Sequence, residues 1–183
     1  YLTKNQKASL VSLTSLHTYS TDSYMVLEPQ TRRNLELFEG GRWGNDTTAS
    51  LLAVLDQTRT SMGGRLLRRW LGQPLLNVGD ILRRQDAVAW FHQNGILRGR
   101  VSALLDSISD LERIINKVRN DSATPRDLVA LRQSLTTAPQ IKEVMADRHA
   151  VGEISWLADG IDDHKVVVEA ISNAIVDSPP VSV

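Results

Sequence analysis

The clearest pattern in this sequence is the stretch Ser61-Met62-Gly63-Gly64-Arg65-Leu66-Leu67-Arg68-Arg69-Trp70-Leu71-Gly72, and it decides the fold class. At about 100° per residue, its five large apolar side chains fall within one half of a helical wheel. Arg65, Arg68 and Arg69 fall within the other half. This division predicts a helix over 61–72 that turns one face, including Trp70, toward a core and presents an arginine stripe on the other face.

The same kind of periodicity recurs on both sides of this stretch and predicts an all-α, multi-helix, bundle-like core domain. Asn77 is expected to cap a helix that ends before Gly95, and Thr124 followed by Pro125 is a strong helix start. Thr47 or Thr48 is expected to cap another helix. The predicted helices cover about 2–19, 48–55, 61–72, 77–93, 96–106, 110–119, 124–135, 139–147, 151–159 and 162–176. One short extended segment, 24–27, precedes Pro29, and residues 40–46 form a loop.

Length and composition exclude several classes of protein. The chain has 183 residues, which suits one domain, and 21 basic residues balance 21 acidic ones. It contains no cysteine, so disulfide scaffolds, cysteine-ligated zinc and thiol nucleophiles are excluded. No apolar run approaches the roughly 20 residues that span a membrane. The start has no signal-peptide pattern and no initiator Met, so we expect an excised fragment of a soluble, cytoplasmic protein.

Motifs for enzymatic chemistry are weak, so no catalytic, cofactor-binding or metal-binding residue is predicted. No Gly-Lys dipeptide occurs, which excludes a phosphate loop, and Gly63-Gly64 favours close helix packing over anion binding. The four histidines form no metal-binding pair. Asp162, Asp163 and His164 are the one acidic-histidine cluster. They favour an acidic helix start, and a helical hydrolase that uses them is the remaining enzymatic alternative.

Charge is distributed unevenly along the chain. Residues 59–100 contain eight arginines and two acids, a balance of +6, whereas residues 141–183 carry three basic residues and eight acids, a balance of −5. Arginine outnumbers lysine sixteen to five, which is typical of planar, bidentate contacts. Two interpretations stay open: the basic face docks on another domain or on nucleic acid, or it pairs with the acidic C-terminal third.

Several motifs, in order along nearly the whole chain, resemble the core domain of the bacterial MutS family of DNA mismatch-repair proteins. The first is Tyr24-Met25-Val26-Leu27-Glu28-Pro29-Gln30-Thr31-Arg32-Arg33-Asn34-Leu35-Glu36-Leu37. Residues 50–71 match the family pattern S-L-L-x-x-L-D-x-T-x-T-x-M-G-x-R-x-L-x-x-W-L. Further matches are Pro74-Leu75, Asp110-Leu111-Glu112-Arg113, Pro125-Arg126-Asp127-Leu128 and Pro179-Pro180. Glu28, where the family usually has Asp, and the 40–46 loop depart from the pattern.

The resemblance implies a larger parent protein: a homodimeric, ATP- and Mg-dependent mismatch sensor that partners MutL and binds mismatched double-stranded DNA. Residues 1–20 would form a helix leading in from a connector domain. Residues 21–183 would be the first part of the helical core, before the lever helix, clamp and ATPase. The fragment itself would be no enzyme and would couple ATP state to DNA clamping. The candidate interdomain contacts are Thr31, Arg32, Arg33, Asn34, Glu36, Arg65, Arg68 and Arg69. The alternative function is an independent helical module for protein interaction or nucleic-acid binding.

Overall fold

The computed structural model describes residues 23–41, 46–146 and 154–180, and within them all regular structure is helical. The helices are α3 (Pro29–Asn34), α4 (Leu51–Leu55), α5 (Ser61–Gly72), α6 (Val78–Gln93), α7 (Gly95–Leu105), α8 (Leu111–Arg119), α9 (Pro125–Met145) and α10 (Lys165–Ala174). Two 3₁₀ turns, η2 (Thr47–Ala49) and η3 (Ser155–Leu157), complete the set. The all-α prediction is therefore confirmed. The expected helix at 2–19 lies outside the described residues.

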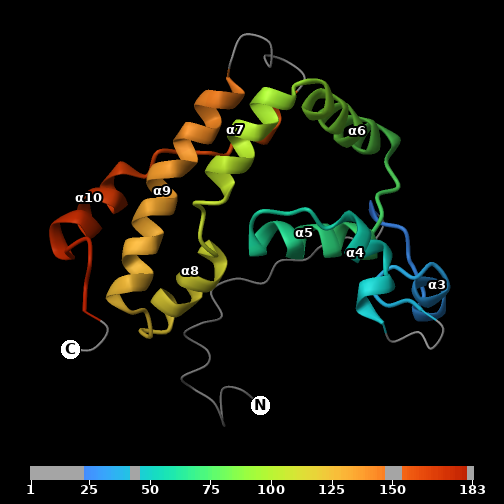
Figure 1. Cartoon of the computed structure of the whole chain (residues 1–183), viewed down its shortest axis with the longest axis horizontal. Coiled ribbons are helices and arrows are strands. Elements are labelled where there is room, and N and C mark those ends of the chain that lie inside the picture. Colours follow the sequence, from blue (N-terminus) through green and yellow to red (C-terminus); the bar gives the residue numbers. More distant parts are fainter. Residues whose placement is uncertain (1–22, 42–45, 147–153, 181–183) are drawn as a thin grey trace.

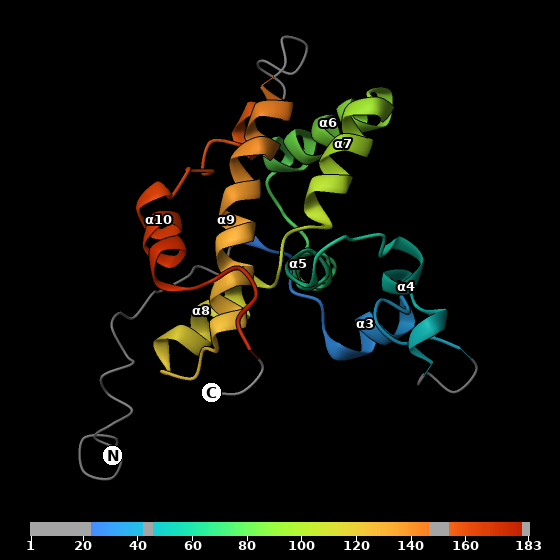
Figure 2. The same ribbon diagram turned by 60° about the vertical axis from the view of Figure 1, so that its left-hand side comes forward.

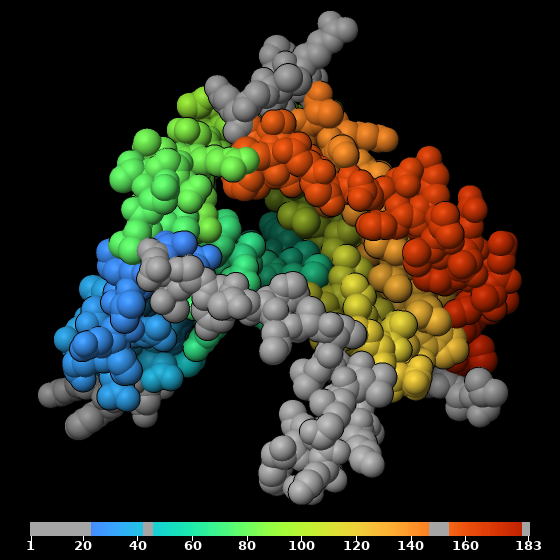
Figure 3. Space-filling model, turned by 180° about the vertical axis from the view of Figure 1, so that it is seen from behind, coloured from blue at the N-terminus to red at the C-terminus, as the bar shows by residue number. Residues whose placement is uncertain are grey.

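Helices α6 to α10 form an arch, with α7 and α9 side by side at its centre, and α3 to α5 lie beneath one arm (Figure 1). Viewed nearly along its axis, α5 lies between the α3–α4 pair and the α8–α9 side of the molecule (Figure 2). From behind, the surface is hollowed between these two sides (Figure 3). Helix α5 is thus the element that bridges the two halves.

The apolar core belongs to the arch. One cluster joins Trp90 of α6, Val101 of α7, Ile141 and Met145 of α9, and the fully buried Ile154 beside η3. A smaller cluster joins α8, α9 and α10 through Ile114, Leu131 and Ile171. Helix α5 contributes only Gly72 to the buried residues. The wheel therefore predicted the helix correctly but not its burial: Leu66 and Trp70 are both 37% exposed.

The extended segment near the start is also confirmed. Tyr24 forms an isolated antiparallel bridge with Leu75, and the amide of Met25 donates to the carbonyl of Pro74 at 2.8 Å. This bridge ties the chain before α3 to the segment that follows α5. The loop over 40–46 is closed by a second bridge between Gly40 and Asp46, and residues 42–45 lie outside the described residues.

Some predicted boundaries were wrong near the start of the domain. Neither Thr47 nor Thr48 caps α4. Asp46 caps the short turn η2, and Ser50 caps α4 by accepting a hydrogen bond from the amide of Ala53 at 3.2 Å. The Ser50 hydroxyl is buried and also donates to the carbonyl of Thr47 at 2.7 Å, which joins the two turns.

Further corrections concern glycine and proline signals. Gly95 begins α7 instead of stopping α6, because Asn94 already ends α6. Pro139 does not separate two helices. It lies inside the continuous α9, whose buried residues Ser134, Thr137, Ile141 and Met145 follow one stripe across it.

Within the described residues, the last two predicted helices are shorter than expected. In place of a helix over 151–159, the described residues contain the single turn η3, which is enough to bring Ile154 and Ala158 into the core. The last helix begins at Lys165, because His164 adopts a left-handed conformation with φ of 42° and keeps 162–164 outside it. No helix in the described ranges combines the length and apolar character that a membrane span requires.

Candidate interdomain interface

Three polar side chains stabilise the start of α5, and all three belong to the 50–71 stretch that matches the family pattern. Thr60 caps the helix by accepting from the amide of Gly63 at 3.0 Å. Four residues before Thr60, the Asp56 carboxylate accepts hydrogen bonds from the amide and hydroxyl of Thr58 at 3.0 and 2.6 Å. These bonds lower the pKa of Asp56. A Cβ on Gly64 would lie 3.3 Å from the Thr58 hydroxyl, so glycine there allows this turn to fold against the helix.

The segment after α3 connects that helix to the rest of the domain. Glu36 has φ of 48°, in the left-handed region, and its carbonyl accepts from the amide of Leu51 at 2.8 Å. The carbonyl of Leu37 accepts from the amide of Leu52 at 3.0 Å, so the chain after α3 anchors α4. Arg32 reaches α5, where its Nη2 donates to the carbonyl of Gly72 at 3.4 Å. The 31–37 stretch thus organises both α4 and α5.

Four of the eight predicted contact residues meet at one place. Arg32 from α3 and Arg65, Arg68 and Arg69 from α5 line a cavity of about 410 Å³, together with Phe38. The Arg68 guanidinium lies over the Phe38 ring, 4.4 Å from its centre. Gly72 lets α5 approach this ring closely, because a Cβ there would be 3.3 Å from the ring edge. The two segments singled out in the sequence therefore form one surface, which we call the arginine cavity.

Arg65 is the member of the arginine cavity that is neutralised within the domain. Its guanidinium donates to both carboxylate oxygens of Asp110 at 2.9 and 2.7 Å, and to Glu112 at 3.0 and 2.6 Å. These bonds lower the pKa of Asp110 and raise that of Arg65. The pairing joins α5 to the start of α8. For Arg65, the carboxylates come from α8 and not from the acidic C-terminal third.

The other predicted contact residues lie beside the cavity without lining it. Thr31, Arg33 and Asn34 are exposed on α3, and the side-chain oxygen Oδ1 of Asn34 accepts from the side-chain Nε2 of Gln30 at 2.8 Å. Glu36 is exposed at the turn that follows. These four residues share the α3 side of the surface, and whether they contact another domain stays a prediction.

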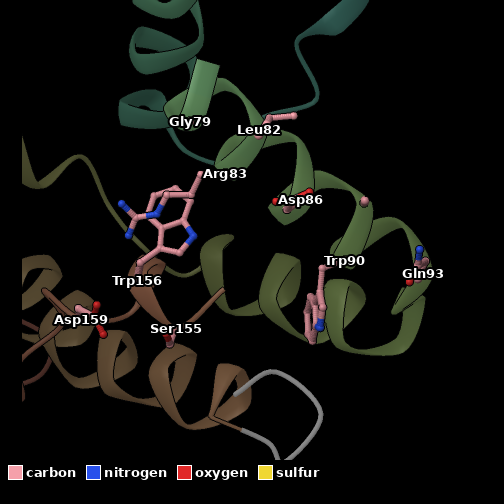
Figure 4. Close-up of a pocket in the computed structure, with 10 residues that line it drawn as sticks. Gly79, Leu82, Arg83, Asp86, Trp90, Gln93, Ser155, Trp156 and Asp159 are labelled. Carbon is pink, nitrogen blue, oxygen red and sulfur yellow. The ribbon is translucent and has the colours of Figure 1, made fainter. Parts of the chain in front are cut away.

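Sequence reasoning missed two arginine–tryptophan stacks on α6. Arg84 lies 3.7 Å from the ring centre of Trp70, and Arg83 lies 4.2 Å from that of Trp156. Adjacent helical residues point about 100° apart, so the pair reaches α5 on one side and η3 on the other. Figure 4 shows Arg83 against Trp156 at the edge of a cavity of about 940 Å³ between α6 and η3. The sequence signal that could have predicted these stacks is the pair of adjacent arginines in α6, together with the tryptophans in two other segments.

The acidic-histidine cluster is arranged as an ion pair. Asp163 accepts from Lys165 Nζ at 2.8 Å, and this contact lowers the pKa of Asp163. Across the described ranges, no three histidine or acidic side chains gather as a metal site would require. These observations direct attention to the arginine cavity as the candidate site.

The fold and the arginine cavity define an all-α core domain whose distinctive residues line a cationic surface and join helices to one another. The model of the family "MutS domain III" matches residues 30–183. The chain belongs to this family.

Relatives named "DNA mismatch repair protein MutS" align with the chain over its whole length. Identity is 44% with the protein of Acetivibrio thermocellus, 43% with that of Symbiobacterium thermophilum and 41% with that of Methanococcoides burtonii. The alignments cover 100% of this chain and 21% of each relative. The chain thus spans about a fifth of the length of the curated relatives it matches.

Proposed function

We propose that these residues are the structural core of a MutS-type protein that recognises mismatched double-stranded DNA in DNA mismatch repair. The match of the family model over residues 30–183 carries this proposal. In the proposed parent, ATP and Mg act at a separate ATPase domain, and these residues catalyse nothing themselves. The parent is cytoplasmic, homodimeric and a partner of MutL.

The core couples the ATPase state to DNA clamping through contacts at the arginine cavity. Packed helices have discrete arrangements, so a shift at one end of a domain is passed on instead of being absorbed. An ATP-driven change moves this equilibrium only if contacts differ between the two states. Arg69 is exposed at the cavity, and Arg68 is held in place by Phe38, so both are suited to such a contact. The connector, clamp and ATPase domains are the proposed partners.

A chimera tests this proposal. Residues 1–183 replace the aligned fifth of the Acetivibrio thermocellus protein, and mismatch binding, ATP hydrolysis and ATP-induced release from mismatched DNA are measured. We expect the chimera to perform all three. A folded chimera that cannot bind mismatched DNA would contradict the proposed role of the domain.

Charge reversal separates the coupling role from folding. Arg69→Glu in the chimera is expected to preserve mismatch binding and to slow ATP-induced release at least tenfold, because it removes a state-dependent contact. Arg119→Glu, which changes an exposed arginine at the end of α8, is the matched control. Equal rates of ATP-induced release in the two variants would contradict coupling through the arginine cavity. They would not contradict the proposal that these residues are the structural core.

A further inference from the structure

The joint between α6 and α7 consists of a chemically reactive dipeptide. A single residue, Asn94, ends α6 and precedes Gly95, the first residue of α7. Asn94-Gly95 is the single Asn-Gly dipeptide of the sequence. Asparagine is a thermolabile residue, because the backbone nitrogen of the next residue can attack its side-chain carbonyl carbon. Glycine has no Cβ and leaves this approach open, so the sequence favours such a reaction at Asn94 over every other asparagine.

The surroundings of Asn94 leave the attacking nitrogen available. Gly95 is exposed, Asn94 is half-buried, and the next residue, Ile96, is 79% exposed, so water reaches the joint. The amide of Gly95 is the first of α7, a position that has no acceptor inside its own helix. Within the described ranges of the chain, no other backbone carbonyl accepts from it. No backbone hydrogen bond therefore restrains the nitrogen that would attack.

One hydrogen bond restrains the side chain of Asn94. Its Nδ2 donates to the carbonyl of Trp90 at 2.8 Å, which ties the carboxamide to the last turn of α6. The same side chain makes no capping bond to α7. The carboxamide must leave Trp90 before Gly95 can attack it, and a single side-chain bond near the surface opens more readily than a helix. The fold therefore slows the reaction without blocking it.

We propose that Asn94 is a site of spontaneous deamidation. The Gly95 nitrogen bonds to Cγ of Asn94, the bond from Cγ to Nδ2 breaks, and the proton of the Gly95 amide leaves with Nδ2 as ammonia. Water then opens the cyclic imide: its hydroxyl adds to one carbonyl carbon, and its proton returns to the Gly95 nitrogen. Opening at Cγ gives aspartate. Opening at the main-chain carbonyl carbon gives isoaspartate, in which the main chain is longer by one methylene.

The two products fit the joint differently. Aspartate at position 94 adds a carboxylate before α7, whose first turn contains no acidic residue, and four residues ahead of Arg98. Both features stabilise a helix start. Isoaspartate lengthens a joint of one residue between two helices that the main core cluster holds together through Trp90 and Val101. Aspartate therefore preserves the packing of α6 against α7, and isoaspartate weakens it.

Mass spectrometry of aged protein tests the proposal. The 183-residue chain is kept warm at mildly alkaline pH, its fold is verified by circular dichroism, and samples are digested with trypsin. Asn94 is the one asparagine of the tryptic peptide 85–98, and Asn77 is the one asparagine of the peptide 70–83. Asn77 is the internal control, because it is exposed before α6 but precedes the β-branched Val78. We expect deamidation at least tenfold faster at Asn94 than at Asn77, and equal rates would overturn the proposal.

Two glycine variants separate this chemistry from general ageing. Gly95→Ala adds a Cβ that would lie 3.8 Å from Nη2 of Arg98, an ordinary contact, so we expect the variant to fold. Its methyl group obstructs the attack on Asn94, and deamidation should slow at least tenfold. Gly99→Ala is the matched control on the same helix, because a Cβ there would meet nothing within 4 Å. An unchanged rate in Gly95→Ala, or equal slowing in Gly99→Ala, would overturn the proposal.

A synthetic peptide with the sequence of residues 85–98 measures how the fold affects the rate. We expect Asn94 to react more slowly in the folded chain than in this peptide, because the bond to the Trp90 carbonyl must first open. No deamidation of the folded chain after complete reaction of the peptide would refute the proposal, since the fold would then block the attack.

Urea unfolding measures the effect of the products on the joint. We expect Asn94→Asp to unfold at the same or a higher urea concentration than the wild type. Aged wild type that contains isoaspartate should unfold at a lower concentration, whereas Gly95→Ala aged in parallel should not change. An unchanged midpoint of the aged wild type would overturn the effect assigned to isoaspartate. These measurements need neither DNA nor ATP, so their outcome is independent of the proposed function.

Discussion

Trp70 and Trp90 are the same residue type in two different environments. Trp90 is 4% exposed in the main core cluster, with the Phe91 ring edge-on at 5.1 Å, whereas Trp70 is 37% exposed beneath Arg84. We expect Trp90→Ala to lower the free energy of unfolding by about 3–5 kcal/mol, as large core truncations do. Trp70→Ala removes partial burial and one exposed cation–π contact, for a loss of about 1–2 kcal/mol.

Urea unfolding followed by circular dichroism measures both losses. Arg84→Ala serves as the control for the stack at Trp70, because it removes the cation and leaves the ring in place. A loss at Trp70 as large as that at Trp90 would show that α5 is packed as a core helix, as the helical wheel predicts.

Asp127 makes the stability of the domain depend on acidity. Its carboxylate accepts from Lys117 Nζ at 2.7 Å and from the hydroxyl and amide of Thr124 at 2.7 and 2.9 Å. These contacts lower its pKa from 3.8 to about 2. A carboxylate with a lower pKa in the folded state stabilises the fold above its unfolded pKa, and this contribution is lost as the pH falls from about 4 to about 2.

The measurement is the free energy of unfolding from pH 7 to pH 2. We expect the decline below pH 4 to be shallower in Asp127→Asn than in the wild type, because the variant has no carboxylate to protonate. Asp86→Asn, the same substitution at an exposed position of α6, is the matched control. If the free energy of unfolding declined equally below pH 4 in Asp127→Asn and in the wild type, the role assigned to Asp127 would be contradicted.

At the scale of elements, local signals predicted helix starts well. Asn77 accepts from the amide of Asp80, and Thr124 forms a reciprocal capping box with Asp127, as their positions in the sequence indicate. Such caps involve residues within one turn, so the sequence contains the whole interaction. The burial of α5 was not predictable in this way, because periodicity identifies an apolar face without showing what covers it.

Pro139 shows the opposite limit of local signals. A proline inside a helix removes one hydrogen bond and disfavours the preceding turn, which is why two helices were predicted. The buried stripe of α9 runs from Leu131 through Ile141 to Met145 and contacts both core clusters. This tertiary packing outweighs the local cost, and it depends on residues far away in the sequence.

Pro139→Ala is therefore expected to stabilise the domain. Alanine is favoured over proline in a helix interior by up to about 3 kcal/mol, partly because alanine restores a backbone hydrogen bond. The more flexible unfolded chain offsets up to about 1 kcal/mol of this gain. We expect a net increase of about 1–2 kcal/mol in the free energy of unfolding. Pro125→Ala is the control: proline at the first helical position replaces no hydrogen bond, so this change should be neutral or slightly destabilising.

At the scale of the molecule, the sequence predicted which residues form the candidate site, but it did not predict that the two groups of residues meet in space. Arg65, Arg68 and Arg69 share a helix face by periodicity alone. Their meeting with Arg32 depends on how α3 packs against α5, through contacts such as that of Arg32 with the carbonyl of Gly72. The cavity that Arg84 lines is formed by α5, α6, α7 and η3, and the double arginine of α6 gave only a weak signal for it in the sequence. Sequence patterns thus identify faces, and packing determines which faces meet.

The charge arrangement predicts how the isolated chain behaves toward DNA. Of the arginines in the +6 stretch, Arg65 is neutralised by two carboxylates, and Arg59 approaches Asp106 at 4.0 Å. Arg68, Arg83 and Arg84 lie over aromatic rings. A stacked arginine keeps its charge, but the ring fixes its orientation. Within the described residues, Arg69, Arg98 and Arg100 are the arginines of this stretch that neither form a salt bridge nor stack on a ring, so about three phosphate contacts are expected. Such contacts carry no sequence information.

We expect weak binding of the 183-residue chain to duplex DNA, equal for a perfectly paired duplex and for one with a single mismatch. With about three phosphate contacts, the affinity should fall roughly 40-fold between 50 and 200 mM salt, because counterion release scales with their number. Titration of both labelled duplexes at the two salt concentrations measures this. Arg100→Glu, at an exposed position of α7, should weaken binding to both duplexes alike, whereas Val166→Asp on α10 should leave it unchanged. A preference for the mismatch that persists at the higher salt would mean that these residues read DNA directly, and it would move mismatch recognition into the core domain itself.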